Sequence, residues 1–96
     1  MNIADKDLAM IKNILSGYVP GCKVWAYGSR VRGDNRKFSD IDLVLLPQTA
    51  IGFEKLCALR AAFQESDLPI SVDLHCWDDI TESFRNIIRS NYAVVM

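Results

Sequence analysis

The chain has 96 residues, half of them hydrophobic and about a quarter charged, with a formal net charge of −1. This composition is typical of a globular protein with one modest core, so we expect a single domain over residues 1–96. A near-neutral chain argues against a general binder of long nucleic acids, which usually shows a basic excess. No run of about 18 apolar residues predicts a membrane helix, and the acidic N-terminus is unlike a signal peptide, so the expected location is cytoplasmic.

Hydrophobic spacing and turn residues predict six main elements in the order α-β-β-α-β-α. The expected fold class is therefore α+β, a small mixed β-sheet flanked by helices. The apolar tail over residues 92–96 is expected either to add a strand or to bind a partner. In chain order, the predicted elements are a helix over 4–16 that ends at Gly17, strands over 22–27 and 40–46, a helix over 50–65, a strand over 70–77, and a helix capped by Asp79 with Glu82 as its capping-box partner.

Two carboxylates stand on one face of the second predicted strand. Asp40 and Asp42 are two residues apart, so on a strand they point the same way, about 7 Å apart. Two such carboxylates without a partner repel each other and raise one pKa. A divalent cation removes this repulsion, and oxygen ligands favour Mg²⁺, with Mn²⁺ as an alternative.

A third carboxylate stands on the third predicted strand. Asp73 lies between two apolar residues, and it completes an acidic cluster with Asp40 and Asp42 if the two strands are neighbours. Three carboxylates can hold two metal ions about 3.5–4 Å apart. Asp73 is also the natural general base. His75 shares the face of Asp73. It could contact the acceptor or tune the base, but a lone histidine is more often simply packed or exposed.

The segment between the first two strands is expected to bind phosphate. A glycine such as Gly28 lets the backbone approach a ligand closely, and Ser29 adds a hydroxyl and the N–H groups of a following helical turn. Arg30 and Arg32 are placed to clamp a triphosphate, because guanidinium groups make bidentate contacts. Ser39 is a candidate for a hydrogen bond to the nucleotide. Arg36 and Lys37 are expected either to join this basic pocket or to lie in solvent.

These residues form a known pattern. Gly28-Ser29, ten further residues and Asp40-Ile41-Asp42, followed by Asp73 in the segment ISVDLH, resemble the signature of the DNA polymerase β-like nucleotidyltransferase superfamily. The resemblance covers about residues 5–90 and implies that superfamily's fold. In size the chain is similar to the minimal nucleotidyltransferase (MNT) domains.

The resemblance to MNT domains implies a specific partner and reaction. MNT proteins are typically paired with a HEPN-domain ribonuclease toxin, and the implied role is that of an antitoxin that transfers AMP from ATP to a tyrosine of the toxin. The chain has no room for the acceptor-binding domain of larger relatives, so the partner is expected to present the hydroxyl. The alternatives are a non-catalytic antitoxin that works by binding, and a nucleotidyltransferase with a small-molecule acceptor. The intact set of Ser29, Asp40, Asp42 and Asp73 favours an enzyme.

Overall fold

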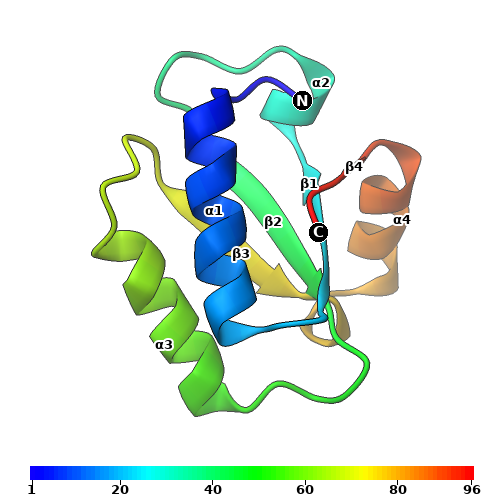
Figure 1. Ribbon diagram of the computed structural model, residues 1–96. Helices are drawn as coiled ribbons and strands as arrows, with labels where there is room; N and C mark the ends of the chain where they lie inside the picture. The colour runs from blue at the N-terminus through cyan, green and yellow to red at the C-terminus, as the bar shows by residue number, and fades with distance from the viewer.

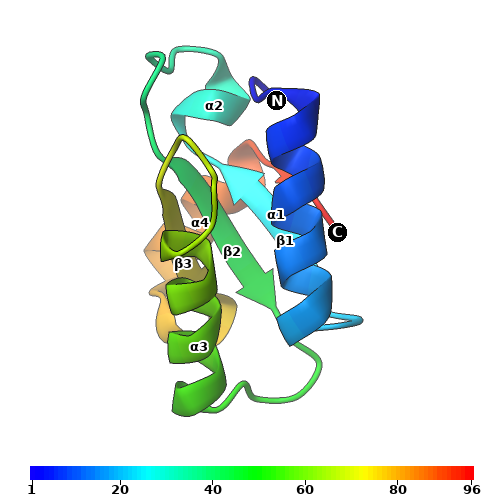
Figure 2. The ribbon, with the colours of Figure 1, turned by 60° about the vertical axis from the view of Figure 1, so that its left-hand side comes forward.

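A four-stranded sheet lies between two helices on one face and a single helix on the other (Figures 1 and 2). The computed structural model describes all residues, 1–96. The predicted α+β class and the order of the six main elements are confirmed. The elements are α1 (Asp5–Tyr18), β1 (Lys23–Tyr27), α2 (Ser29–Arg32), β2 (Ile41–Leu46), α3 (Phe53–Gln64), β3 (Val72–Cys76), the 3₁₀ helix η1 (Trp77–Asp79), α4 (Glu82–Ser90) and β4 (Ala93–Val94).

The sheet is mixed, with the strand order β3-β2-β1-β4. Strand β1 runs antiparallel to both β2 and β4, whereas β2 and β3 are parallel. The parallel pair needs a crossover, which α3 supplies. The register aligns Tyr27 with Asp42 and Asp42 with Asp73, so these three residues form one row across the sheet.

The front face of the sheet, covered by α1 and α3, carries the main core (Figure 1). On β2, alternate residues point to this face, and Ile41, Leu43 and Leu45 are completely buried there. They pack with Ile11 and Leu15 from α1 in a cluster of 14 buried residues. Because side chains alternate along a strand, the intervening Asp42 points to the back face.

The back face is covered by α4, which Figure 2 shows from the side, and by the short helix η1, whose Trp77 packs against the same cluster. Its buried cluster consists of three residues, Tyr27, Val44 and Ile88, with partly buried aromatic neighbours around them. In α4 itself only Ile88 is buried. Of the Tyr27–Asp42–Asp73 row, only Tyr27 is buried in this cluster, and the two aspartates are left more open.

Helix α4 begins later than the sequence predicts. The expected cap, Asp79, lies instead in η1, and Ile80 is extended after it. Thr81 is the cap, and its hydroxyl accepts a hydrogen bond from the backbone N–H of Phe84 at 3.2 Å. Threonine is itself a favourable N-cap residue. Thr81 therefore caps the helix in place of Asp79, and Glu82 is the first residue of the helix.

The other boundaries differ less. Helix α1 continues through Gly17, its expected end, to Tyr18. The turn after it uses Gly21, whose φ of +78° is a conformation that favours glycine. The tail forms the strand β4, one of the two alternatives expected for it. None of the helices is long and apolar enough to cross a membrane.

Candidate active site

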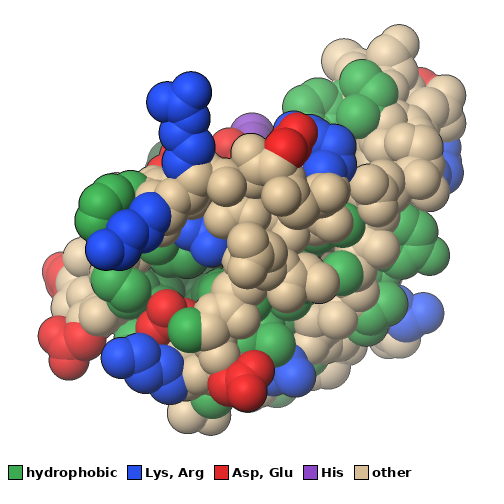
Figure 3. All heavy atoms as spheres, turned by 90° about the horizontal axis from the view of Figure 1, so that it is seen from above, with side chains coloured by type: hydrophobic (Ala, Val, Ile, Leu, Met, Phe, Trp, Pro, Cys, Tyr) green, Lys and Arg blue, Asp and Glu red, His purple; other side chains and the backbone are tan.

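Asp42 and Asp73 form the centre of the candidate site. They occupy matching positions on the parallel strands β2 and β3, and both line a cleft of about 480 Å³ on the back face. Seen from the α2 end of the molecule, acidic, basic and histidine side chains lie beside one another there (Figure 3). The condition set for the acidic cluster, that the second and third predicted strands are neighbours, is thus met.

The surroundings of Asp42 disfavour its ionised form. Burial raises the pKa of its carboxyl group from 3.8 to about 6, and the charges of Asp73 and then of Asp40 add to this rise. A hydrogen bond shared with Asp73 raises the pKa further, whereas His75 lowers it. The site is therefore short of positive charge, which is the state that a bound cation relieves.

Asp40 is not gathered with the other two aspartates. Strand β2 begins only at Ile41, and Asp40 lies before it, exposed and outside the cleft lining. No three Asp, Glu, His or Cys side chains in this structure are close enough together to hold a metal ion. The predicted cluster of three is therefore an assembled pair, Asp42 and Asp73, with Asp40 near enough to act on Asp42 by its charge.

The turn between β1 and α2 brings the backbone against Asp42. Gly28 has φ +82° and ψ −156°, a conformation that side chains rarely adopt. A Cβ atom at this position would collide with Oδ2 of Asp42. Helix α2 then starts at Ser29, and the first N–H groups of a helix have no partner within it. Gly28, Ser29 and Arg32 all line the cleft.

The two arginines expected to clamp phosphate have different surroundings. Arg32 lines the cleft and is exposed, with Nε 3.3 Å from Oδ2 of Asp34. Arg30 is only 6% exposed, and its guanidinium group donates to the carbonyl oxygens of Asn2, Lys37 and Ser39. The expectation for Arg30 therefore needs correcting, because its donors are used to fix the loop between α2 and β2.

The polar side chains of that loop also stay out of the cleft. The hydroxyl of Ser39 accepts a hydrogen bond from the backbone N–H of Arg36 at 2.8 Å, which closes a turn. Ser39 is absent from the cleft lining, so the contact expected between its side chain and the nucleotide is not supported by this placement. Arg36 and Lys37 are exposed and lie outside the cleft, as expected for a solvated loop.

Several lining residues were not expected from the sequence. Tyr27 belongs to the back-face cluster yet borders the cleft, and burial raises the pKa of its phenol, helped by the charges of Asp42 and Asp73. His75, which the sequence places on the face of Asp73 without fixing its role, has Nε2 3.4 Å from Oδ2 of Asp73. The remaining wall comes from α4 and the residue after it, which contribute Phe84, Ile87, Ser90 and Asn91. The spacing of Phe84, Ile87 and Ile88 indicates one apolar helical face in the sequence, but it does not distinguish the exposed Ile87 from the buried Ile88.

A larger hollow of about 600 Å³ lies at the other end of β1 and β2, between the loops at 19–22 and 47–52. Its charged residues, Glu54 and Lys55, are exposed residues of α3. It contains no paired carboxylates and no phosphate-binding turn. The smaller cleft is therefore the candidate active site.

A carboxylate pair on a mixed sheet, faced by a glycine-serine turn, defines a nucleotidyltransferase. The sequence model of the family described as "Polymerase beta, Nucleotidyltransferase" matches residues 9–96. The chain belongs to this family, which confirms the resemblance seen in the sequence. Enzymes of the family generally use ATP and a divalent metal ion.

Individual relatives are also similar over nearly the whole chain. The "Probable protein adenylyltransferase MntA" of Haemophilus influenzae is 44% identical over 95 residues, which are 99% of this chain and 83% of that protein. A crystal structure of a toxin–antitoxin with AMP-PNP superposes with a TM-score of 0.77 at 19% identity, covering 93% of this chain and 72% of the other. A tri-AMPylated Shewanella oneidensis HEPN toxin in complex with MNT antitoxin gives a TM-score of 0.72 at 16% identity, covering 95% and 70%.

Proposed function

We propose that this protein is an antitoxin that transfers AMP from ATP to the hydroxyl group of a tyrosine in a partner HEPN-domain toxin. The 44% identity to the Haemophilus influenzae relative, over 99% of this chain and 83% of that protein, is the observation that carries this proposal. The arrangement of Gly28, Ser29, Asp42 and Asp73 around one cleft supports it, because the chemistry needs these groups together.

The reaction is a displacement at the α-phosphorus of ATP. The acceptor oxygen forms a bond to phosphorus, the bond to the pyrophosphate oxygen breaks, and the acceptor proton moves to the carboxylate of Asp73. Asp73 is half exposed, so an acceptor can reach it from solvent. The Gly28-Ser29 turn and Arg32 hold the phosphates that leave, because backbone N–H groups and a guanidinium group stabilise the developing negative charge.

The carboxylates of Asp42 and Asp73 would hold the divalent metal, Mg²⁺ or in its place Mn²⁺. Asp40, which lies exposed just before β2, would complete the set by turning toward Asp42. The raised pKa of Asp42 supports this assignment, since the pair repels itself without a cation. Two Mg²⁺ ions, when bound, would neutralise the triphosphate and favour loss of the acceptor proton.

The HEPN partner is proposed from the solved complexes of structurally similar proteins, one of which contains an AMPylated HEPN toxin. Residues 1–96 are proposed to act as one minimal nucleotidyltransferase domain, with the toxin supplying the acceptor in a hetero-oligomer. The proposed partner implies a cytoplasmic location, because a ribonuclease toxin acts in the compartment that contains its RNA substrate.

The test is transfer of label from α-labelled ATP with Mg²⁺ to the partner that co-purifies with the protein. We expect label on the partner with the wild type and with Asp67→Asn, an exposed aspartate outside the cleft. We expect none with Asp42→Ala. Tight complex formation without any transfer by the wild type would refute the enzymatic proposal and leave neutralisation by binding.

A further inference from the structure

The last turn of α4 presents an apolar and an amide side chain to the cleft. Ile87 is 67% exposed, although the next residue, Ile88, is completely buried. Asn91 is the residue directly after the helix and follows Ile87 by four positions. Both line the cleft. The exposed apolar surface of Ile87 has no partner within the protein.

The sheet order separates this wall from the residues that handle the acceptor. Asp73 and His75 stand on β3, at one edge of the sheet. Helix α4 crosses the back face from β3 toward β1. The centre of the Phe84 ring lies 6.0 Å from that of His75 on β3 and 5.7 Å from that of Tyr27 on β1. The helix then leads to Tyr92, whose ring stacks on Trp25 of β1 at 4.0 Å. Ile87 and Asn91 are thus on the side of the cleft away from β3.

The geometry of the displacement assigns a ligand to each side. The attacking oxygen and the leaving pyrophosphate lie on opposite sides of the phosphorus. With the pyrophosphate at Gly28-Ser29 and Arg32, which follow β1, the acceptor enters at Asp73 on β3. The nucleoside, attached to the same phosphorus, is left with the wall formed by the end of α4.

The end of α4 has the chemistry to bind a nucleobase. The Ser90 hydroxyl donates to the carbonyl of Ile87 at 2.6 Å, so Asn91 supplies the free polar group of this wall. An asparagine amide pairs its oxygen with the amino group of adenine and its nitrogen with a ring nitrogen. On the edge that carries N7, guanine has a carbonyl oxygen in place of that amino group, so an amide oriented for adenine makes only one of the two bonds there.

We propose that Ile87 and Asn91 form the nucleobase subsite, in which Ile87 supports the face of the base and Asn91 selects adenine over guanine. This inference rests on the proposed nucleotidyl transfer and specifies which nucleotide that reaction uses.

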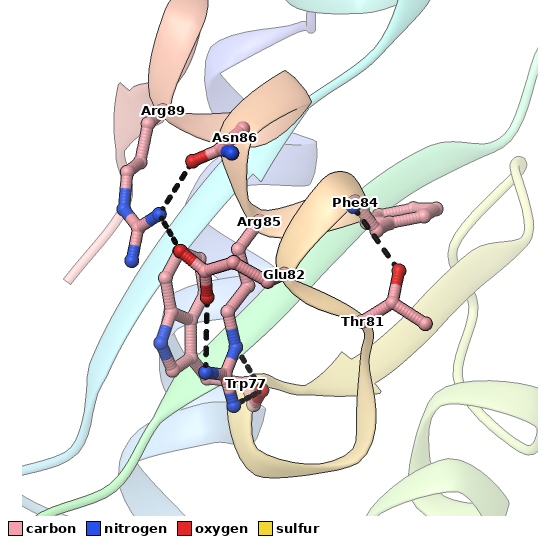
Figure 4. A network of polar contacts seen from close by, with 7 residues as sticks. All are labelled: Trp77, Thr81, Glu82, Phe84, Arg85, Asn86 and Arg89. Carbon is pink, nitrogen blue, oxygen red and sulfur yellow. Dashed lines mark hydrogen bonds and ion pairs between the residues drawn. The ribbon is translucent and has the colours of Figure 1, made fainter.

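Polar contacts on the other side of α4 hold this wall in place (Figure 4). Arg85 donates twice to the carbonyl of Trp77, at 3.0 and 2.8 Å, and its guanidinium lies over the Trp77 ring. Arg89 donates to Glu82 and to Asn86, both at 2.8 Å. Phe84 points away from this network in Figure 4. Because Asn86 is an amide of the same helix that is already bonded and lies outside the cleft, it is a matched control for Asn91.

The experiment measures nucleotide binding by calorimetry, using the α,β-methylene analogues of ATP and GTP with Mg²⁺, because these cannot release pyrophosphate. The protein is used with its co-purified partner, and partner retention is recorded. We expect both Asn91→Leu and Asn91→Asp to weaken binding of the ATP analogue by about tenfold and to change binding of the GTP analogue little. Asn86→Leu should leave both affinities unchanged, because Arg89 keeps its hydrogen bond to Glu82 and the wall stays in place. Ile87→Ser should weaken binding of both analogues alike. The matched control is Val94→Ser, at a valine that is 68% exposed and outside the cleft, and it should weaken binding of neither.

Equal binding of the two analogues by the wild type, or an unchanged preference in both Asn91 variants, would overturn the subsite. The same holds if Val94→Ser matches Ile87→Ser, or if the Ile87 and Asn91 variants lose the partner and keep the nucleotide. A preference for the ATP analogue that depends on Asn91, without any AMP transfer by the wild type, would support the subsite and refute the proposed function instead.

Discussion

Asp42 and Asp73 face each other across two parallel strands, and the burial of Asp42 together with this second carboxylate raises the pKa of Asp42 to about 6. The ionised pair therefore costs folding free energy in the absence of a cation. The chemistry of the site and the stability of the fold are coupled through these two residues.

The first prediction concerns the pH dependence of stability without metal. A pKa raised from 3.8 to about 6 in the folded state means that stability is complete below about pH 4 and falls as the pH rises through 6. The loss corresponds to roughly 3 kcal/mol at most. Asp42→Asn should therefore be more stable than the wild type at pH 7.5 in EDTA, and the advantage should shrink towards pH 4.5, as measured by urea denaturation. An advantage of the same size at both pH values would contradict this account.

The second prediction separates backbone strain from collision at Gly28. Gly28→Ala should lower both stability and transfer activity, because the new Cβ meets Oδ2 of Asp42. Gly21→Ala is the matched control, since Gly21 has a similar φ of +78° but nothing within 4 Å of an added Cβ. We expect Gly21→Ala to cost about 1–2 kcal/mol of unfolding free energy and to keep activity. Equal effects of the two substitutions on activity would mean that the close approach to Asp42 does not matter.

The third prediction assigns different roles to two neighbouring arginines. Arg30→Ala should lower the free energy of unfolding by about 2–4 kcal/mol, because it empties a buried position and leaves partly buried carbonyl groups without their donors. Arg32→Ala should change stability by less than about 0.5 kcal/mol, as expected for an exposed side chain, and raise the KM for ATP. Denaturation curves and initial rates of label transfer measure the two effects, and a reversed pattern would place Arg30 at the substrate.

The fourth prediction tests the start of α4. Thr81→Ala should cost about 1 kcal/mol, because it removes the acceptor for the backbone N–H of Phe84. Asp79→Ala, at the cap expected from the sequence, should cost much less. Thermal unfolding of both variants beside the wild type gives the comparison. A larger loss at Asp79 would show that the helix is stabilised from η1.

Much of the site could be predicted because its residues obey local rules. Strand alternation places Asp42 on the face opposite Ile41 and Leu43, and a glycine between a strand and a helical turn indicates close backbone approach. Both expectations depend on residues within a few positions of one another, and the structure agrees with both.

The placements that differ from expectation depend on more than a local pattern. Arg30 and Arg32 lie in one helical turn and look equivalent in the sequence, but only Arg30 reaches the carbonyl of Asn2, 28 residues away. Asp40 and Ser39 precede the strand, where the alternation of faces no longer applies. The wall formed by α4 depends on how that helix crosses the sheet, which no short-range pattern specifies.

The unequal cover of the two faces has a consequence for motion and turnover. The front helices share one extended core, whereas α4 is anchored by a single fully buried side chain and a set of surface polar contacts. Lifting α4 should need much less free energy than global unfolding, so its amides should exchange with solvent hydrogen ahead of those of β1 and β2. The floor of the cleft would stay folded during such an opening, which gives spent nucleotide a way out that leaves the carboxylate row in register.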